Sequence, residues 1–168
     1  IKTCSDQLIG PLCMIFNKSI EEGIVPDELK TAKIIPVCKS DDKKTVSNYR
    51  PISVLPAFSK ILERLVYNRL FDFINKHNIL SKNQYGFRKN ISTSLALLDL
   101  VDKISTSIEN NEYTIGIFLD LAKAFDTVNH NNLLKKLYHY GIRGNAYDWF
   151  NNYCKQQATI CLFKRLPV

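Results

Sequence analysis

The sequence predicts an α+β fold that is rich in helices and contains a small antiparallel sheet, or flap. Three observations support this class. Apolar residues make up 45% of the 168 positions, which is enough to bury a core. Five segments carry apolar residues at helical spacing. Two short apolar runs flank a polar stretch, as paired strands flank a turn.

The first part of the chain predicts a helix followed by the flap. Apolar residues recur every four positions over residues 5–20, and Gly23 then supplies a helix terminator. Residues 32–38 predict a strand, which Pro36 restricts to a sheet edge or a bulge because proline has no N–H to donate. A polar turn leads to a return strand at residues 49–54.

The second part predicts helices around one further strand. A long helix is expected over residues 59–77, and Ser92 or Thr93 is expected to cap the next one. That helix should face the core with five apolar residues, which are Leu95, Leu98, Val101, Ile104 and Ile108. The remaining predicted elements are a strand at residues 113–120, a helix at 131–140 that ends at Gly141, and a helix at 145–156.

The positive charge is concentrated in one part of the chain. The net charge is +7, and residues 30–69 hold nine basic and three acidic residues, a balance of +6. Such a block indicates a polyanionic partner, most simply nucleic acid, although a solvated basic face fits the charge equally well.

No membrane partner is expected, since no apolar run approaches the roughly 18 residues of a membrane span and no signal peptide is visible. Five scattered cysteines favour a reducing compartment. The prediction is therefore an intracellular protein, nuclear or cytoplasmic. Nothing in the sequence indicates an obligate protein partner.

Asp120 is the first candidate for chemistry. The apolar run 115–119 reads as a buried strand that delivers this carboxylate at its end, where it could hold a divalent cation such as Mg2+. Taken alone, an acid at the end of a strand is more often a helix cap or a turn former. Phe125 is either a core aromatic or a ring that crowds the ribose 2′ position of a nucleotide, and Asp126 is more simply a structural cap.

The flap and a later loop are the other candidates. Lys33, Lys39 and Arg50 flank the polar turn, and Pro51 biases the backbone of Arg50 toward an extended form that could aim the guanidinium at a triphosphate. The alternative is ordinary surface charge. A loop whose residues include Gln84, Gly86, Phe87 and Arg88 combines aromatic, flexible and basic residues suited to a single strand. The alternative is an ordinary loop with a buried Phe87.

Four segments, in this order, resemble the reverse transcriptases of non-LTR (LINE-like) retrotransposons. They read AKIIPV with Lys39 (from residue 32), NYRPISVL (from residue 48), NQYGFR (from residue 83) and FLDLAKAFDTV (from residue 118). The resemblance implies a right-hand polymerase that uses Mg2+, dNTPs, an RNA template and a DNA primer. This chain would then be an incomplete domain, with fingers and fingers/palm helices at about 1–112, the start of the palm at 113–157, and an atypical tail at 158–168.

The resemblance also implies roles for individual residues. Asp120 would be the first catalytic, metal-binding aspartate, and the backbone carbonyl of Leu121 would help to hold a metal. Phe125 would be the steric gate against ribonucleotides. The incoming triphosphate would be contacted by Arg50 and by Lys33 or Lys39. Template or primer would lie near the loop residues Gln84, Gly86, Phe87 and Arg88.

The chain departs from the family after residue 157. The family's Pro-Gln-Gly segment and its Tyr-or-Phe-x-Asp-Asp turn, which supplies further catalytic aspartates, are not among these 168 residues. We therefore expect the chain to be inactive on its own. The alternatives are a non-catalytic nucleic-acid-binding remnant, a polymerase fragment similar to group II intron maturases, and a decayed element without function.

Overall fold

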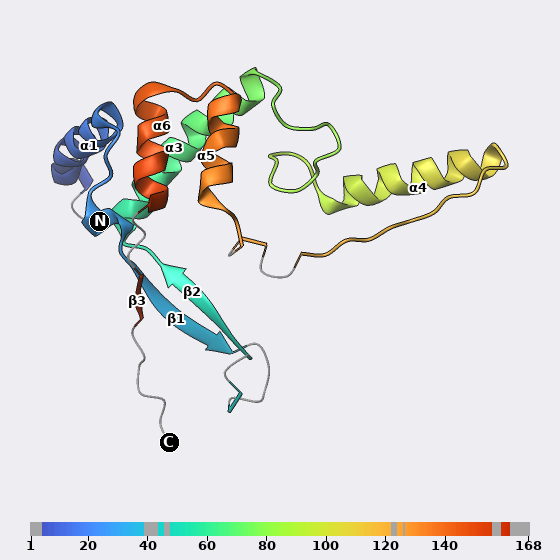
Figure 1. Ribbon diagram of the computed structural model, residues 1–168, viewed down its shortest axis with the longest axis horizontal. Helices are drawn as coiled ribbons and strands as arrows, with labels where there is room; N and C mark the ends of the chain where they lie inside the picture. Colours follow the sequence, from blue (N-terminus) through green and yellow to red (C-terminus); the bar gives the residue numbers. More distant parts are fainter. Residues whose placement is uncertain are drawn as a thin grey trace. The chain divides into compact units, whose positions relative to one another are not determined.

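The computed structural model describes residues 5–38, 44–45, 48–121, 124–125, 127–155 and 159–161. The chain forms two units, one made of Ile1–Arg69 with Val128–Val168 and one made of Leu70–Thr127. Figure 1 labels the elements, which are α1 (Ser5–Glu22), α2 (Asp27–Lys30), β1 (Ala32–Cys38), β2 (Tyr49–Val54), α3 (Ala57–Lys76), α4 (Thr93–Glu109), α5 (His130–His139), α6 (Gly144–Lys155) and β3 (Thr159–Cys161). The prediction of a helix-rich chain with a small antiparallel sheet is confirmed, and all five predicted helices are present.

The first unit contains the hydrophobic core. Phe16 from α1, Val25 from the following turn, Leu62 from α3 and Trp149 from α6 are buried against one another. The apolar residues whose spacing predicts these helices therefore lie on the side of each helix that faces the core, because residues three and four apart share a side of a helix. A second buried set joins α5 to the turn before α6, and consists of Leu134, Leu137 and Ile142.

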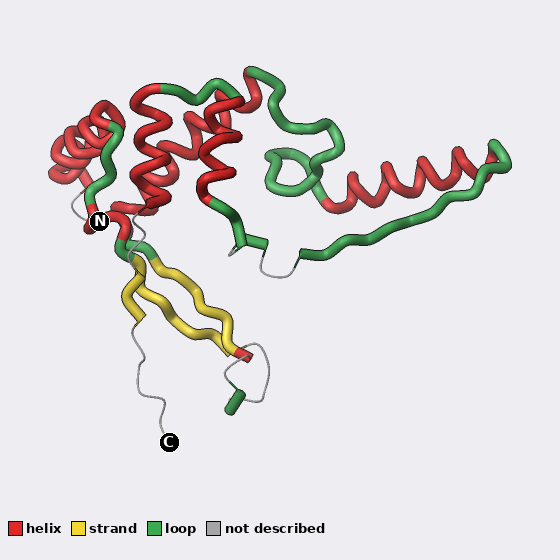
Figure 2. The backbone as a smooth tube through the Cα atoms, viewed as in Figure 1, coloured by secondary structure: helices red, strands yellow, loops and turns green. Residues whose placement is uncertain are grey.

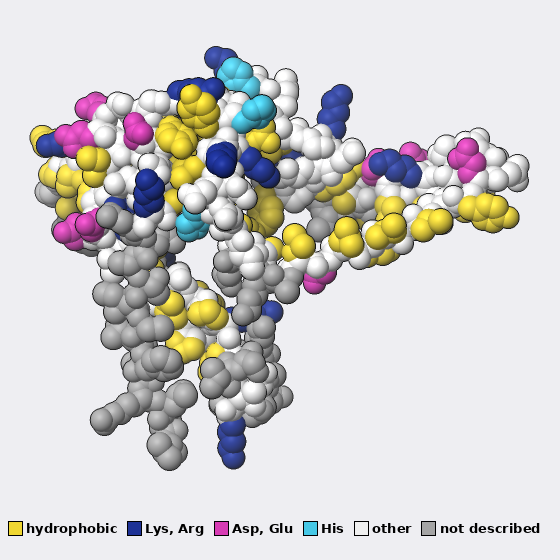
Figure 3. Space-filling view, viewed as in Figure 1, with side chains coloured by type: hydrophobic (Ala, Val, Ile, Leu, Met, Phe, Trp, Pro, Cys, Tyr) yellow, Lys and Arg dark blue, Asp and Glu magenta, His cyan; other side chains and the backbone are white. Residues whose placement is uncertain are grey.

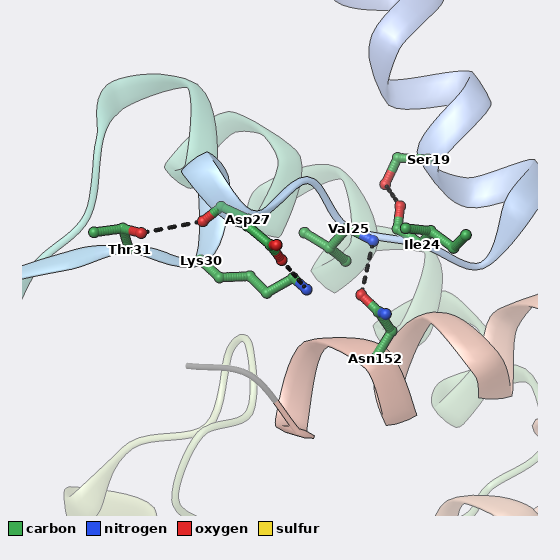
Figure 4. A network of polar contacts seen from close by, with 7 residues as sticks. All are labelled: Ser19, Ile24, Val25, Asp27, Lys30, Thr31 and Asn152. Atoms are coloured by element: carbon green, nitrogen blue, oxygen red, sulfur yellow. Dashed lines mark hydrogen bonds and ion pairs between the residues drawn. The ribbon is translucent and has the colours of Figure 1, made fainter. Parts of the chain in front are cut away.

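Polar side chains fix the turn after α1 to α6. Trp149 Nε1 donates to Ser19 Oγ over 3.2 Å, and Ser19 Oγ donates to the carbonyl of Ile24 over 2.6 Å. The Val25 N–H donates to Asn152 Oδ1 over 3.0 Å, as Figure 4 shows. These contacts satisfy buried polar groups in a turn that would otherwise leave them unpaired.

The flap is the antiparallel pair β1–β2, and its register runs from Lys33 opposite Val54 to Cys38 opposite Tyr49. Pro36 lies opposite Pro51, and since neither residue has an N–H, this must be a non-hydrogen-bonded pair of the ladder. The predicted flap is thus confirmed (Figure 2).

The prediction that β1 is an edge strand is wrong at its start. β3 adds to its other side in parallel at Ala32, Lys33 and Ile34, so that the sheet order is β2-β1-β3. Pro36 lies beyond this stretch, where no strand pairs with the second edge of β1 among the described residues. Proline is tolerated there because no hydrogen bond is required of it.

The second unit has helices but no buried side chain among its described residues. Ser92 caps α4 as predicted, its side chain accepting the N–H of Leu95 over 3.4 Å. The prediction that α4 faces a core is wrong, because Leu98 and Ile108 are 64% and 68% exposed and no residue of the helix is buried. Within the second unit, no described residue buries this face.

The predicted strand at residues 113–120 is also wrong. The segment is extended but carries no strand assignment, and its apolar side chains are exposed, with Phe118 at 87% and Leu119 at 89%. A strand is stabilised by its ladder of hydrogen bonds to a neighbour. None of the described strands pairs with this segment, so the sequence pattern alone cannot make it one.

Candidate nucleic-acid and nucleotide site

The register of the flap places Lys33 and Arg50 on the same face. Lys33 pairs with Val54 and Arg50 with Val37, so these residues share one side of the two strands with Ile35 and Ile52. Four strand positions separate the two cations, which corresponds to about 13 Å along the strand. Both are exposed, and neither has an ion-pair partner within the described part of the chain.

This face of the flap is both basic and apolar. Ile35 and Ile52 lie between the two cations, Val37 lies opposite Arg50, and all three side chains are 42–46% exposed. A partner with a charged group and a planar or apolar body would suit such a face. Lys39, the third predicted cation, lies outside the described residues.

The loop before α4 holds itself in a defined turn. Gln84 Nε2 donates to the carbonyl of Gly86 over 3.3 Å, and Arg88 Nη1 donates to the carbonyl of Ser81 over 3.2 Å. Phe87 adopts a φ of 61° and its side chain is 85% exposed. The alternative of a buried Phe87 is therefore wrong, and the ring is presented outward from a backbone conformation that non-glycine residues rarely adopt.

A three-residue polar network attaches this loop to α4. The Tyr85 hydroxyl donates to Asp99 Oδ2 over 2.7 Å, and Lys103 Nζ donates to the same oxygen over 2.8 Å. The hydrogen bonds from Lys103 and Tyr85 lower the pKa of Asp99, and the bond to Asp99 raises the pKa of Tyr85. Sequence reasoning missed this network, although the spacing of Asp99 and Lys103 by four residues is a signal for a helical ion pair.

Phe125 lies against Phe87. Their ring centroids are 5.8 Å apart and the rings are nearly perpendicular, which is a favoured edge-to-face arrangement. The structure thus brings the predicted gate residue to the predicted template loop within the second unit. Asp126 lies outside the described residues.

Asp120 and Leu121 lie at the end of the extended segment, and both are exposed. A carboxylate and a carbonyl are the hard oxygen ligands that Mg2+ prefers. They are too few to complete a site, and among the described residues no group of three or more His, Cys, Asp or Glu side chains could hold a metal ion. The donor chemistry therefore fits Mg2+, but other ligands are needed.

A basic flap face together with an outward-facing aromatic loop is typical of proteins that bind nucleic acid. Comparison with known proteins makes the class specific. Residues 40–168 match the family model described as reverse transcriptase (RNA-dependent DNA polymerase). The chain belongs to this reverse transcriptase family.

The most similar relatives include polymerases of mobile elements. The RNA-directed DNA polymerase from mobile element jockey of Drosophila melanogaster is 39% identical over 137 residues, which is 81% of this chain and 15% of that protein. The RNA-directed DNA polymerase from transposon BS, of the same species, is 35% identical over 75% of this chain and 14% of its own length. The COX1/OXI3 intron 1 protein of Saccharomyces cerevisiae is 29% identical over 82% of this chain and 15% of its own length.

These findings confirm the resemblance to the polymerases of non-LTR retrotransposons. By family the chain is that of a nucleotidyltransferase. It spans about one seventh of the length of the curated relatives it matches. In the described part of the chain, no helix is both long enough and apolar enough to cross a membrane.

Proposed function

We propose that this chain is the fingers and the first part of the palm of a right-hand reverse transcriptase that copies RNA into DNA. The fingers and the fingers/palm helices occupy residues 1–112, the start of the palm residues 113–157, and an atypical tail residues 158–168. The observation that carries the proposal is the ordered set of four motifs, the last three of which lie within the family match over residues 40–168, together with similarity to mobile-element polymerases.

Asp120 is proposed as the catalytic carboxylate. Together with the Leu121 carbonyl it would hold Mg2+, which when bound supplies positive charge for the phosphates and acidifies the primer hydroxyl. The primer 3′-hydroxyl attacks the α-phosphate of a dNTP and pyrophosphate leaves. Asp120 contributes its negative charge at the end of an extended segment, where it is exposed and accessible to a ligand.

Phe125 is proposed as the steric gate that excludes a ribose 2′-hydroxyl. Its contact with Phe87 supports this role, because a gate must be held in place to reject a group as small as a hydroxyl. The same contact would link the gate to the loop of Gln84, Gly86, Phe87 and Arg88, for which we propose template or primer binding.

Arg50 and Lys33 are proposed to contact the triphosphate of the incoming dNTP, with Lys39 as a further candidate. Their position on one face of the flap, without an ion-pair partner among the described residues, supports this assignment. The guanidinium of Arg50 offers a planar fork for phosphate oxygens, whereas Lys33 acts as a point charge.

The 168 residues on their own are proposed to be inactive, because they supply too few metal-binding acids for a two-metal site. The test is incorporation of labelled dTMP on poly(rA)–oligo(dT) with the purified chain and Mg2+. No incorporation is expected. Incorporation that disappears in Asp120→Ala would contradict this part of the proposal.

The proposed residue roles can be tested in a chimera of this chain and a related polymerase. The 137 aligned residues of the jockey polymerase would be replaced by those of this chain, and dTMP incorporation measured. An active chimera should lose activity at least about a hundredfold in Asp120→Asn, which keeps the shape but removes the charge. Phe125→Ala should admit rUMP while dTMP incorporation persists. A chimera that stays fully active with Asp120→Asn would overturn the assignment.

A non-catalytic nucleic-acid-binding function is the second candidate, favoured by the unpaired cations on one flap face. It predicts that affinity for single-stranded RNA falls with salt, with a log–log slope of about 0.7 for each phosphate contacted. Combining Lys33→Ala with Arg50→Ala should reduce the log–log salt slope by the contribution of one or two phosphate contacts. An unchanged slope would remove this candidate.

A further inference from the structure

The exposed side of α5 and the turn that follows it carry a second group of cations and aromatic rings. We call this group the α5 surface, and its residues are Lys135, Lys136, Tyr138, His139, Tyr140 and Arg143. All six side chains are exposed, whereas Leu134 and Leu137 of α5 are buried. Figure 3 shows basic and hydrophobic side chains interspersed over this part of the molecule.

Among the described residues, no ion pair involves a cation of the α5 surface. The pairs Lys18–Glu22, Lys30–Asp27 and Lys103–Asp99 lie elsewhere, on α1, α2 and α4. Asp148 is the one acidic residue in positions 128–155, and its Cβ lies beside Gly23 in the turn after α1. An unpaired cluster of this kind attracts a polyanion more strongly than paired surface charges do.

The aromatic rings of the α5 surface are held in place. The Arg143 guanidinium lies 3.4 Å from the centroid of the Tyr138 ring and also donates to the Tyr138 carbonyl. The Tyr147 ring meets the same tyrosine edge-on at a centroid distance of 5.6 Å. Tyr138 and Tyr140 nevertheless remain 52% and 46% exposed. Fixed aromatic rings and guanidinium planes are the platforms on which unpaired bases stack.

We propose that the α5 surface binds a single-stranded nucleic acid. Lys135, Lys136 and Arg143 contact the phosphates, and the rings of Tyr138 and Tyr140 stack against bases, which a duplex would not make available. The α5–α6 turn lies at the opposite end of the first unit from the flap (Figure 1), so this contact is separate from the one proposed for Lys33 and Arg50. It does not depend on polymerase activity.

The test is fluorescence anisotropy of the whole chain with labelled 15-nucleotide oligo(U) and oligo(dT) across a range of KCl concentrations. Lys135→Gln, Lys136→Gln and Arg143→Gln are combined in one variant. The control variant combines Lys18→Gln, Lys76→Gln and Lys155→Gln, which removes the same charge from α1, α3 and α6. Circular dichroism establishes that both variants are folded.

The α5 variant should lower the log–log salt slope by about 2, at roughly 0.7 for each of three phosphates, whereas the control should leave the slope unchanged. Tyr140→Ser should weaken binding at least about fivefold without changing the slope, because it removes stacking and no charge. If the α5 variant binds both oligo(U) and oligo(dT) more weakly, the ligand is any single strand. If it binds only oligo(U) more weakly, the ligand is RNA. Equal slopes for the α5 and control variants overturn the proposal.

Photocrosslinking separates this proposal from the one made for the flap. Oligo(U) that contains 4-thiouridine should crosslink to a peptide with Tyr138 or Tyr140, and this should persist when Lys33→Gln and Arg50→Gln are combined. Crosslinks confined to peptides from β1 or β2 overturn the α5 proposal while leaving the flap assignment intact.

Discussion

At the scale of single residues, two glycines allow the effect of backbone conformation to be distinguished from the effect of close packing. Gly23 and Gly144 both adopt a positive φ, of 67° and 57°. A Cβ added at Gly23 would lie 2.8 Å from Asp148 Cβ, whereas one added at Gly144 would meet nothing within 4 Å. Gly23 is thus required both by its conformation and by the approach of α6 to the turn after α1.

Gly23→Ala should therefore destabilise the chain more than Gly144→Ala. Gly144→Ala carries only the cost of the left-handed conformation, about 1–2 kcal/mol. Gly23→Ala adds a clash that α6 must relieve by moving, and overpacking of this kind costs about 1–3 kcal/mol more. Urea unfolding followed by tryptophan fluorescence measures both values. Equal losses for the two variants would show that the close approach of α6 is not maintained in solution.

The Tyr85–Asp99–Lys103 network leads to a prediction about pH. The pKa of Tyr85 is raised, so its hydrogen bond is fully present below its ordinary pKa of about 10 and is lost as pH rises through the higher folded value. The pKa of Asp99 is lowered, so its contribution is present above its ordinary pKa of about 3.9 and is lost as pH falls through the lower folded value.

Attachment of the loop to α4 should consequently be constant between about pH 5 and pH 9. Phenolate absorbance should contain a component that titrates above the ordinary tyrosine pKa of about 10, and this component should lose the contribution of one tyrosine in Tyr85→Phe. In Asp99→Asn it should move back to lower pH. A late component that is unchanged in Tyr85→Phe would assign the shift to another tyrosine.

At the scale of elements, α4 shows that an amphipathic pattern does not guarantee burial. Its apolar residues have the spacing of a core-facing helix, yet none of them is buried. Ser92 still caps it, because capping depends on local backbone geometry and needs no distant partner.

Polar substitutions on α4 should therefore be tolerated. Leu97→Gln with Leu98→Gln should change the free energy of unfolding by less than about 1 kcal/mol, since the two side chains are 62% and 64% exposed. The same variant should reduce light scattering, because it breaks an exposed apolar stripe. Leu62→Ala is the control; it is 2% exposed and should cost about 2–5 kcal/mol. A large loss in the α4 variant would mean that this face is buried in solution.

At the scale of the whole molecule, the buried residues and the proposed catalytic residues belong to different units. Every buried side chain among the described residues lies in Ile1–Arg69 or Val128–Val168. Asp120, Phe125 and the loop of Gln84 to Arg88 lie in Leu70–Thr127, which has none. Without buried apolar area, the second unit has little to oppose local opening.

Amide hydrogen exchange rates should differ between the two units. The amides of α1 and α6 should exchange slowly, because opening them exposes the core of Phe16, Val25, Leu62 and Trp149. The amides of α4 and of residues 113–121 should exchange at least about a hundredfold faster, since their opening costs little. Similar protection in both units would mean that the second unit gains stability from a source other than side-chain burial.

The sequence was sufficient for features that depend on neighbours within a few positions. Helical periodicity, the Ser92 cap and the terminators at Gly23 and Gly141 predicted the helices within a few residues, and the two apolar runs around a polar turn predicted the flap. The ordered motifs were sufficient for the family as well, because family membership is a property of the residue pattern itself.

The tertiary structure alone decided which apolar faces are buried and which extended segments become strands. Residues 113–120 have the composition of a buried strand but lack a partner among the described strands, while Thr159–Cys161, which the sequence did not mark as a strand, pairs with β1. The contacts of Tyr85 with Asp99 and of Phe87 with Phe125 likewise join residues 14 or more positions apart. Strand pairing and side-chain contact at such separations depend on where the chain returns, and local periodicity carries no information about that.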